Sequence, residues 1–208
     1  MSTTSQPVST SGIIGPARFS YLNFFEPSAM KIAGQENNKR YYSVSLLIPK
    51  NTAEGQKVYA KAKAMVDAAI REGIEKKTFS EAMVKNVKFW NPIQDGDQKI
   101  NKQTGKVDET YAGHWFISTK SEEKNGRPQI VNELGQAMPV VSPDNVYSGM
   151  YGRAHVNFYA YNNASFGIGC SLNHLQKLAD GEKFGGKPSV EGLFNDDFVF
   201  DSGAISLD

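Results

Sequence analysis

The chain has 208 residues, of which 39% are hydrophobic and 22% are charged. That is enough apolar material for one packed domain, and it argues against disorder throughout. No run of about 18 apolar residues occurs, which excludes a membrane-spanning helix, and the Ser/Thr-rich start lacks the regions of a secretory signal.

The charge is unevenly distributed. The net charge is only +1, yet residues 191–208 carry five acids and no lysine or arginine, which leaves 23 basic groups and 17 of the 22 acids in residues 1–190. We therefore expect a mildly basic body with an acidic tail. The single cysteine, Cys170, excludes an internal disulfide and fits a reducing, cytoplasmic setting. The three histidines have no zinc-ligand spacing, so no metal or cofactor is predicted.

The N-terminal half predicts two strands and one helix. Residues 1–12 are polar and of low complexity, which is typical of disorder. Residues 17–22 alternate as a strand, with Ala17, Phe19 and Tyr21 on one face, and Pro27 ends or bends it. Residues 41–48 form a second strand, in which Tyr42, Val44, Leu46 and Ile48 share a face.

A helix is expected from Asn51 onward. Asn51 and Glu54 form a capping-box-like pair, and Gly73 is a stop signal. The apolar stripe at helical spacing consists of Val58, Ala62, Met65, Ala69 and Ile70. Residues 79–87 are compatible with a short helix or a strand.

The C-terminal half is dominated by short strands. Residues 98–110 predict an exposed loop or hairpin tip, whereas residues 113–120, 147–161 and 166–172 predict strands. Residues 173–178 predict a helical turn, and residues 183–189 predict a linker into the tail. Six to eight short strands with one good helix indicate a mainly β fold, a small barrel or sandwich, rather than a βαβ repeat.

The strand from Tyr151 to Tyr161 has an unusual outward face. Side chains alternate across a strand, so the small and apolar residues at 152, 154, 156, 158 and 160 share the inner face. The outer face carries aromatic and basic groups and no acid: Tyr151, Arg153, His155, Asn157, Tyr159 and Tyr161. Nucleic-acid bases stack on such rings, worth about 1–3 kcal/mol each. A second core layer, or cover by the 98–110 loop, explains the face equally well.

Three further segments place basic groups beside aromatics. They begin at Arg18, Lys39 and Lys88, and their recurrence favours one shared groove for single-stranded nucleic acid. Either tryptophan is also compatible with a core position. The predicted groove residues are Arg18, Tyr21, Arg40, Tyr42, Trp90, Trp115, Tyr151, Arg153, His155, Tyr159 and Tyr161.

Catalytic interpretations find little support. Asp95 and Asp97 are spaced like paired carboxylates, but Asp-Gly-Asp is far more often a tight turn. Cys170 lies in an apolar strand, where an inert core thiol is expected, and Pro188 prevents residues 185–189 from acting as a phosphate loop. The sequence therefore predicts a protein that is not an enzyme.

The tail mixes acids with phenylalanines. This composition favours docking, either onto the basic groove of the same chain or onto another protein. The predicted contact residues are Asp196, Asp197, Phe198, Phe200 and Asp201.

An ordered series of short motifs resembles a known family. The motifs are residues 15–27, 42–50, 95–97, 111–116, 146–154, 158–162 and 172–178. They are similar to those of the bacteriophage single-stranded-DNA-binding family once catalogued only as a domain of unknown function, over residues 13–186. The resemblance implies an oligonucleotide-binding (OB) barrel that coats single-stranded DNA (ssDNA) during phage replication or recombination, in the host cytoplasm.

The resemblance also implies that the acidic tail contacts replication or recombination proteins. The expected organisation is a disordered N-terminus (1–12), an OB-fold domain with extended loops (13–186), and a linker with the acidic tail (187–208). A homodimer or cooperative assembly on ssDNA stays open. The first alternative is a phage structural or assembly protein that uses the β-rich surface for protein contacts, and an enzyme of nucleic-acid metabolism ranks last.

Overall fold

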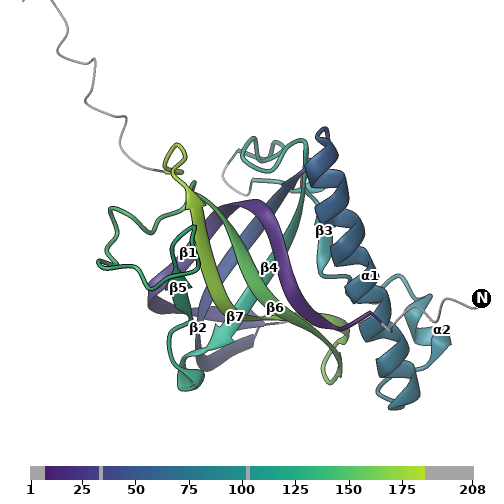
Figure 1. The fold of residues 1–208 in the computed structure, drawn as a ribbon. Coiled ribbons are helices and arrows are strands. Elements are labelled where there is room, and N and C mark those ends of the chain that lie inside the picture. Colours follow the sequence, from purple (N-terminus) through teal and green to yellow (C-terminus); the bar gives the residue numbers. More distant parts are fainter. Residues whose placement is uncertain (1–7, 33–34, 102–103, 186–208) are drawn as a thin grey trace, which may run out of the picture.

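A closed barrel of five strands forms the body of the protein (Figure 1). The computed structural model describes residues 8–32, 35–101 and 104–185. The barrel strands are β1 (Ser11–Ile32), β2 (Gln35–Pro49), β4 (His114–Glu122), β6 (Tyr151–Asn162) and β7 (Phe166–Ala179). They pair in the order β4-β2-β1-β6-β7, and the parallel contact of Lys120 with Ser171 closes β7 onto β4.

Short elements extend the barrel. Strand β3 (Ile93–Asp95) pairs with β4, and β5 (Gln129–Val131) pairs with β7. The helices are α1 (Ala53–Glu75) and α2 (Glu81–Val84), with single 3-10 turns η1 (Gly96–Gln98) and η2 (Glu123–Asn125). The predicted mainly β fold with one or two helices is confirmed. No helix of the described residues is both long and apolar enough to cross a membrane.

The core fills the barrel interior as the alternation of β6 predicts. Gly152, Ala154, Val156 and Phe158 are buried on its inner face, and they meet Phe19, Leu46 and Ile117 from the neighbouring strands. Strand β1 bends rather than ends near Pro27, because its pairing with β2 shifts register between Asn23 and Ser28. It also starts before Ile13, because Ser11 pairs with Asn157.

Helix α1 lies along one side of the barrel, against β6 and β1 (Figure 1). Its predicted apolar stripe is buried at Val58, Ala62, Met65 and Ala69. The expected cap was wrong by one residue: the Thr52 hydroxyl, and not Asn51, accepts the backbone N–H of Gly55 at 3.0 Å. The reason is a tight entry from β2, where a Cβ on Gly55 would lie 1.9 Å from the Pro49 carbonyl oxygen.

Two other local predictions were wrong. Gly73 does not end the helix, which continues to Glu75, because this glycine makes room for Phe79 and Ala160. Residues 173–178 are strand and not a helical turn, because both edges of β7 are paired there, with β6 and with β5. Residues 79–87, left open between helix and strand, contain the short α2.

Candidate nucleic-acid interface

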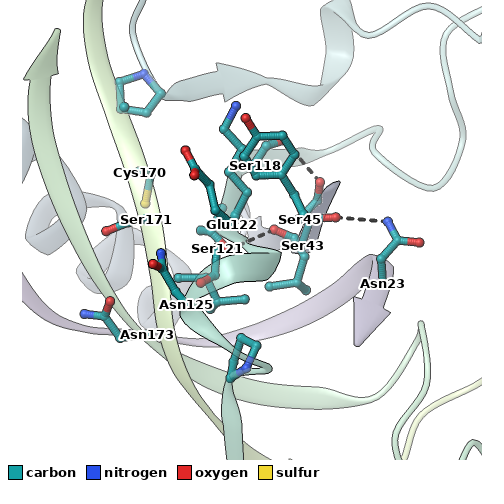
Figure 2. A pocket seen from close by; sticks show the side chains of 18 of the residues that line it. Asn23, Ser43, Ser45, Ser118, Ser121, Glu122, Asn125, Cys170, Ser171 and Asn173 are labelled. Atoms are coloured by element: carbon teal, nitrogen blue, oxygen red, sulfur yellow. Dashed lines mark hydrogen bonds between the residues drawn. The ribbon is translucent and has the colours of Figure 1, made fainter. Parts of the chain in front are cut away.

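A cleft of about 1630 Å³ runs across the outside of the barrel over β2, β4 and β7. Its middle is polar: Figure 2 shows hydroxyl and amide side chains of Ser43, Ser45, Ser118, Ser121, Ser171 and Asn173 around it. Asn23 Nδ2 donates to Ser43 Oγ at 2.9 Å, and the Ser45 and Ser118 hydroxyls are 3.2 Å apart. These bonds fix the polar floor of the cleft.

The charges around the cleft are mostly positive. Among the described residues, the basic side chains that line it are Lys39, Lys99, Lys120, Lys124 and Arg127, against one acid, Glu122. Lys39 and Lys124 contact the Glu122 carboxylate at 3.0 and 2.9 Å, and their hydrogen bonds lower its pKa. The cleft therefore presents an excess of positive charge to a ligand.

Two of these lysines lie over aromatic rings. The Nζ atom of Lys99 is 3.2 Å from the ring centre of Tyr111 and 4.7 Å from that of Tyr21. Lys120 Nζ is 4.8 Å from the ring centre of Tyr41. Burial lowers the pKa of both Lys99 and Lys120. Partly desolvated cations attract an anion more strongly than fully hydrated ones, because the local dielectric constant is lower.

Four of the predicted groove residues line the cleft: Tyr21, Trp90, Tyr159 and Tyr161. Tyr21 is 63% exposed and has a left-handed φ of 46° at a register shift of β1. This bulge turns the Tyr21 ring outward. The prediction that Tyr21 shares a face with Phe19, which is buried, was therefore wrong. Tyr159 is 41% exposed, and its ring packs over Gly169 of β7.

Three predicted residues lie outside this cleft. On β2 it is the neighbouring Tyr41, not Tyr42, that lines it. Both Nε and Nη2 of Arg40 donate to the Pro27 carbonyl, at 3.1 and 2.7 Å. Trp115 stacks on Tyr59 of α1, with ring centres 3.9 Å apart, beside a separate cavity of about 300 Å³.

The remaining four do not line the cleft, although His155 contacts Asn173, which does. Arg18 donates to the carbonyls of Gly149 and Glu182, at 3.1 and 2.9 Å, and its guanidinium lies over the rings of Phe184 and Tyr151. Arg153 donates to Gln176 Oε1 at 2.9 Å. His155 lies between Ser11 and Asn173. The outward face of β6 is therefore divided, and only its C-terminal end, Tyr159 and Tyr161, borders the cleft.

The predicted groove residues omit several that line the cleft, although two of them belong to the basic–aromatic segment that begins at Lys39: Lys39, Tyr41, Lys99, Tyr111, Lys120, Lys124 and Arg127. Lys120 is the last residue of the predicted strand 113–120, and its place in that strand could have marked it as a candidate groove residue. Lys99 lies in the 98–110 loop predicted to be exposed and Tyr111 directly follows that loop, but Tyr111 is fully buried beneath Lys99. Nothing local in the sequence indicates that burial.

The carboxylates of Asp95 and Asp97 belong to a turn, as expected. Asp95 accepts the backbone N–H of Asp97 at 2.9 Å, and both carboxylates contact Lys50. In the described ranges no group of three or more potential ligands could hold a metal ion. Cys170 is buried, which raises the pKa of its thiol far above the ordinary value. The tail residues Asp196, Asp197, Phe198, Phe200 and Asp201 lie outside the described residues.

The strand order and the cleft define the class: this is an OB-fold barrel with a groove across the strands where nucleic acids bind in such folds. The family model described as "Enterobacter phage Enc34, ssDNA-binding protein" matches residues 10–202. The chain belongs to this family of phage ssDNA-binding proteins. It is also 30% identical to protein p50 of Acyrthosiphon pisum secondary endosymbiont phage 1, over 84% of this chain and 87% of that protein.

Solved structures show the same fold. The ssDNA-binding protein of bacteriophage Enc34 in complex with ssDNA superposes with a TM-score of 0.59 and 20% identity, over 83% of this chain and 88% of that chain. The ssDNA-binding protein gp2.5 of bacteriophage T7 superposes with a TM-score of 0.52 and 15% identity, over 92% and 100%. These matches confirm the predicted OB-fold.

Proposed function

We propose that this protein binds single-stranded DNA in the cleft over β2, β4 and β7 and coats it during phage DNA replication or recombination. One observation carries the proposal: basic side chains and exposed aromatic rings converge on a single long cleft. Lysine and arginine would neutralise phosphates, while Tyr21, Trp90 and Tyr159 would stack on bases. Membership of a family of phage ssDNA-binding proteins supports this assignment.

Binding would be independent of sequence. Rings stack on any base because every base has a π-face, and the hydroxyls of the cleft floor both donate and accept hydrogen bonds. Discrimination among bases instead needs a fixed pattern of donors and acceptors. The protein would thus cover and protect ssDNA wherever it forms in the host cytoplasm, without a catalytic role.

The acidic tail would serve protein contacts. Residues 187–208 carry the contact candidates Asp196, Asp197, Phe198, Phe200 and Asp201. Acids and phenylalanines together suit a basic, apolar pocket on a replication or recombination protein.

The two tryptophans provide a built-in test. Trp90 is 50% exposed at the cleft, whereas Trp115 is covered by Tyr59. Titration with oligo-dT should quench the fluorescence of the wild type and of Trp115→Phe, and should leave Trp90→Phe nearly unquenched. A matched duplex should quench much less. Absent quenching, or equal quenching by both DNAs, would reject ssDNA binding in the cleft and favour the phage assembly role.

A further inference from the structure

The turn after α2, residues 85–88, leads along the chain to Trp90, which lines the cleft. The Trp90 backbone is fixed to β7: its N–H donates to Phe166 O, and its carbonyl accepts the N–H of Ile168, both at 3.0 Å. Gly167 lies directly beneath, where a Cβ would be 2.4 Å from the Trp90 carbonyl oxygen. The position of the indole at the rim is therefore set by the barrel itself.

The turn of residues 85–88 is exposed at all four positions and held by hydrogen bonds. The Asn86 N–H donates to Met83 O at 3.1 Å, and Asn86 Oδ1 accepts the Lys88 N–H at 2.9 Å. Phe89 anchors the end of the turn by packing edge-on against Phe79, with ring centres 5.2 Å apart. A turn held at both ends presents its tip in a defined orientation.

The tip combines positive charge with apolar surface. Lys85 and Lys88 are exposed, and Val87 between them is 100% exposed. Within the described residues no acidic side chain lies within ion-pairing distance of either lysine. These charges are available to an external anion, and Lys85 and Lys88 are five and two residues from Trp90, an aromatic ring that lines the cleft.

We propose that the bound ssDNA leaves the cleft past Trp90 and continues over residues 85–88, where Lys85 and Lys88 contact its phosphates. Val87 offers an apolar contact to a base or sugar. This extension rests on the proposed function, and it makes the binding site longer than the cleft. The occupant, ssDNA, is a polyanion with exposed bases. It matches a surface that combines the charges of two lysines with the apolar side chain of Val87 and the ring of Trp90.

The test compares two oligo-dT lengths in a fluorescence anisotropy titration: about 5 nucleotides, to fill the cleft, and about 16, to reach beyond it. The variant is Lys85→Gln with Lys88→Gln. Lys57→Gln with Lys61→Gln, which removes two exposed lysines from α1, is the matched control. At 150 mM salt, charges more than about 8 Å away are largely screened, so the control should bind both lengths as the wild type does.

We expect the Lys85/Lys88 variant to lose several-fold in affinity for the longer oligonucleotide and none for the shorter one. Its log–log salt slope with the longer one should become shallower by about 1.4, for two lost phosphate contacts. Unchanged affinity for the longer DNA, or an equal loss in the control, would overturn the extension and leave the cleft assignment intact. A wild type that binds neither length would overturn the proposed function itself.

Discussion

Tyr159 and Arg153 point to the same side of β6 but have different surroundings. Tyr159 lines the cleft, packed over Gly169, and burial raises the pKa of its hydroxyl. Arg153 is bound to Gln176, whose amide in turn donates to the carbonyls of Asn132 and Glu133 at 3.1 and 3.0 Å. Arg153 therefore supports a loop, whereas the Tyr159 ring is accessible to a ligand.

The two side chains should respond differently to removal. Tyr159→Ala should weaken oligo-dT binding by about 1–3 kcal/mol, because one base loses its stacking partner, with little change in melting temperature. Arg153→Ala should lower the melting temperature and leave affinity unchanged. Anisotropy titrations and thermal unfolding of both variants decide the matter. A loss of affinity in Arg153→Ala equal to that in Tyr159→Ala would show that the whole outward face of β6 contacts DNA.

The same contrast explains why single residues were hard to place from sequence. The period of two in β2 puts Tyr42 on the face of the core residues Val44 and Leu46, and the cleft accordingly borders Tyr41 on the opposite face, although Tyr42 was the predicted groove residue. The alternation gives two faces, and only barrel closure through β4 and β7 decides which outward positions border a groove. Tyr21 was displaced by a register shift in β1 that depends on distant pairing with β2.

At the scale of elements, Gly73 shows how packing overrides local preference. A glycine in a helix interior is less favourable than alanine by about 0.5–1 kcal/mol. Here a Cβ would lie 2.6 Å from the Phe79 ring and 2.7 Å from Ala160 Cβ. The glycine therefore allows α1 to approach β6 closely, and through Phe79 it supports the segment that leads to Trp90.

We expect Gly73→Ala to destabilise the protein by about 1–3 kcal/mol, because overpacking of a core contact outweighs the gain in helix propensity. Chemical denaturation measures the change. Arg71→Ala, at an exposed position of the same helix, should stay within about 0.5 kcal/mol of the wild type. A Gly73→Ala protein more stable than the wild type would mean that the contact with β6 relaxes freely.

Elements with strong local patterns were predictable and those fixed by long-range pairing were not. The stripe of α1 and the alternation of β6 identified both elements, because their burial follows from periodicity. The second half of β7 was missed because residues 173–178 become strand only through pairing with β5 and β6. Burial of Tyr111 under Lys99 likewise depends on how the 98–110 loop folds back onto the barrel.

For the whole molecule, the distribution of charge matters more than its sum. The net charge is +1, yet five basic residues and one acid of the described part of the chain line the cleft. Five further acids lie in residues 191–208. Field lines concentrate in such a cleft, so a nearly neutral protein still attracts a polyanion there.

Salt should therefore weaken ssDNA binding in proportion to the cations in the cleft. On a single strand each phosphate contact contributes about −0.7 to the slope of log affinity against log salt concentration. Five contacts therefore give a slope of about −3.5, or about a 100-fold loss of affinity between 50 and 200 mM salt.

Lys120→Met should make this slope shallower by about 0.7, because Lys120 lies on the cleft floor over Tyr41. Lys61→Met on α1 is the control and should leave it unchanged. Anisotropy titrations at four salt concentrations measure the slopes. A wild-type slope near zero would mean that stacking alone holds the DNA, and equal effects of the two variants would place the phosphates outside the cleft.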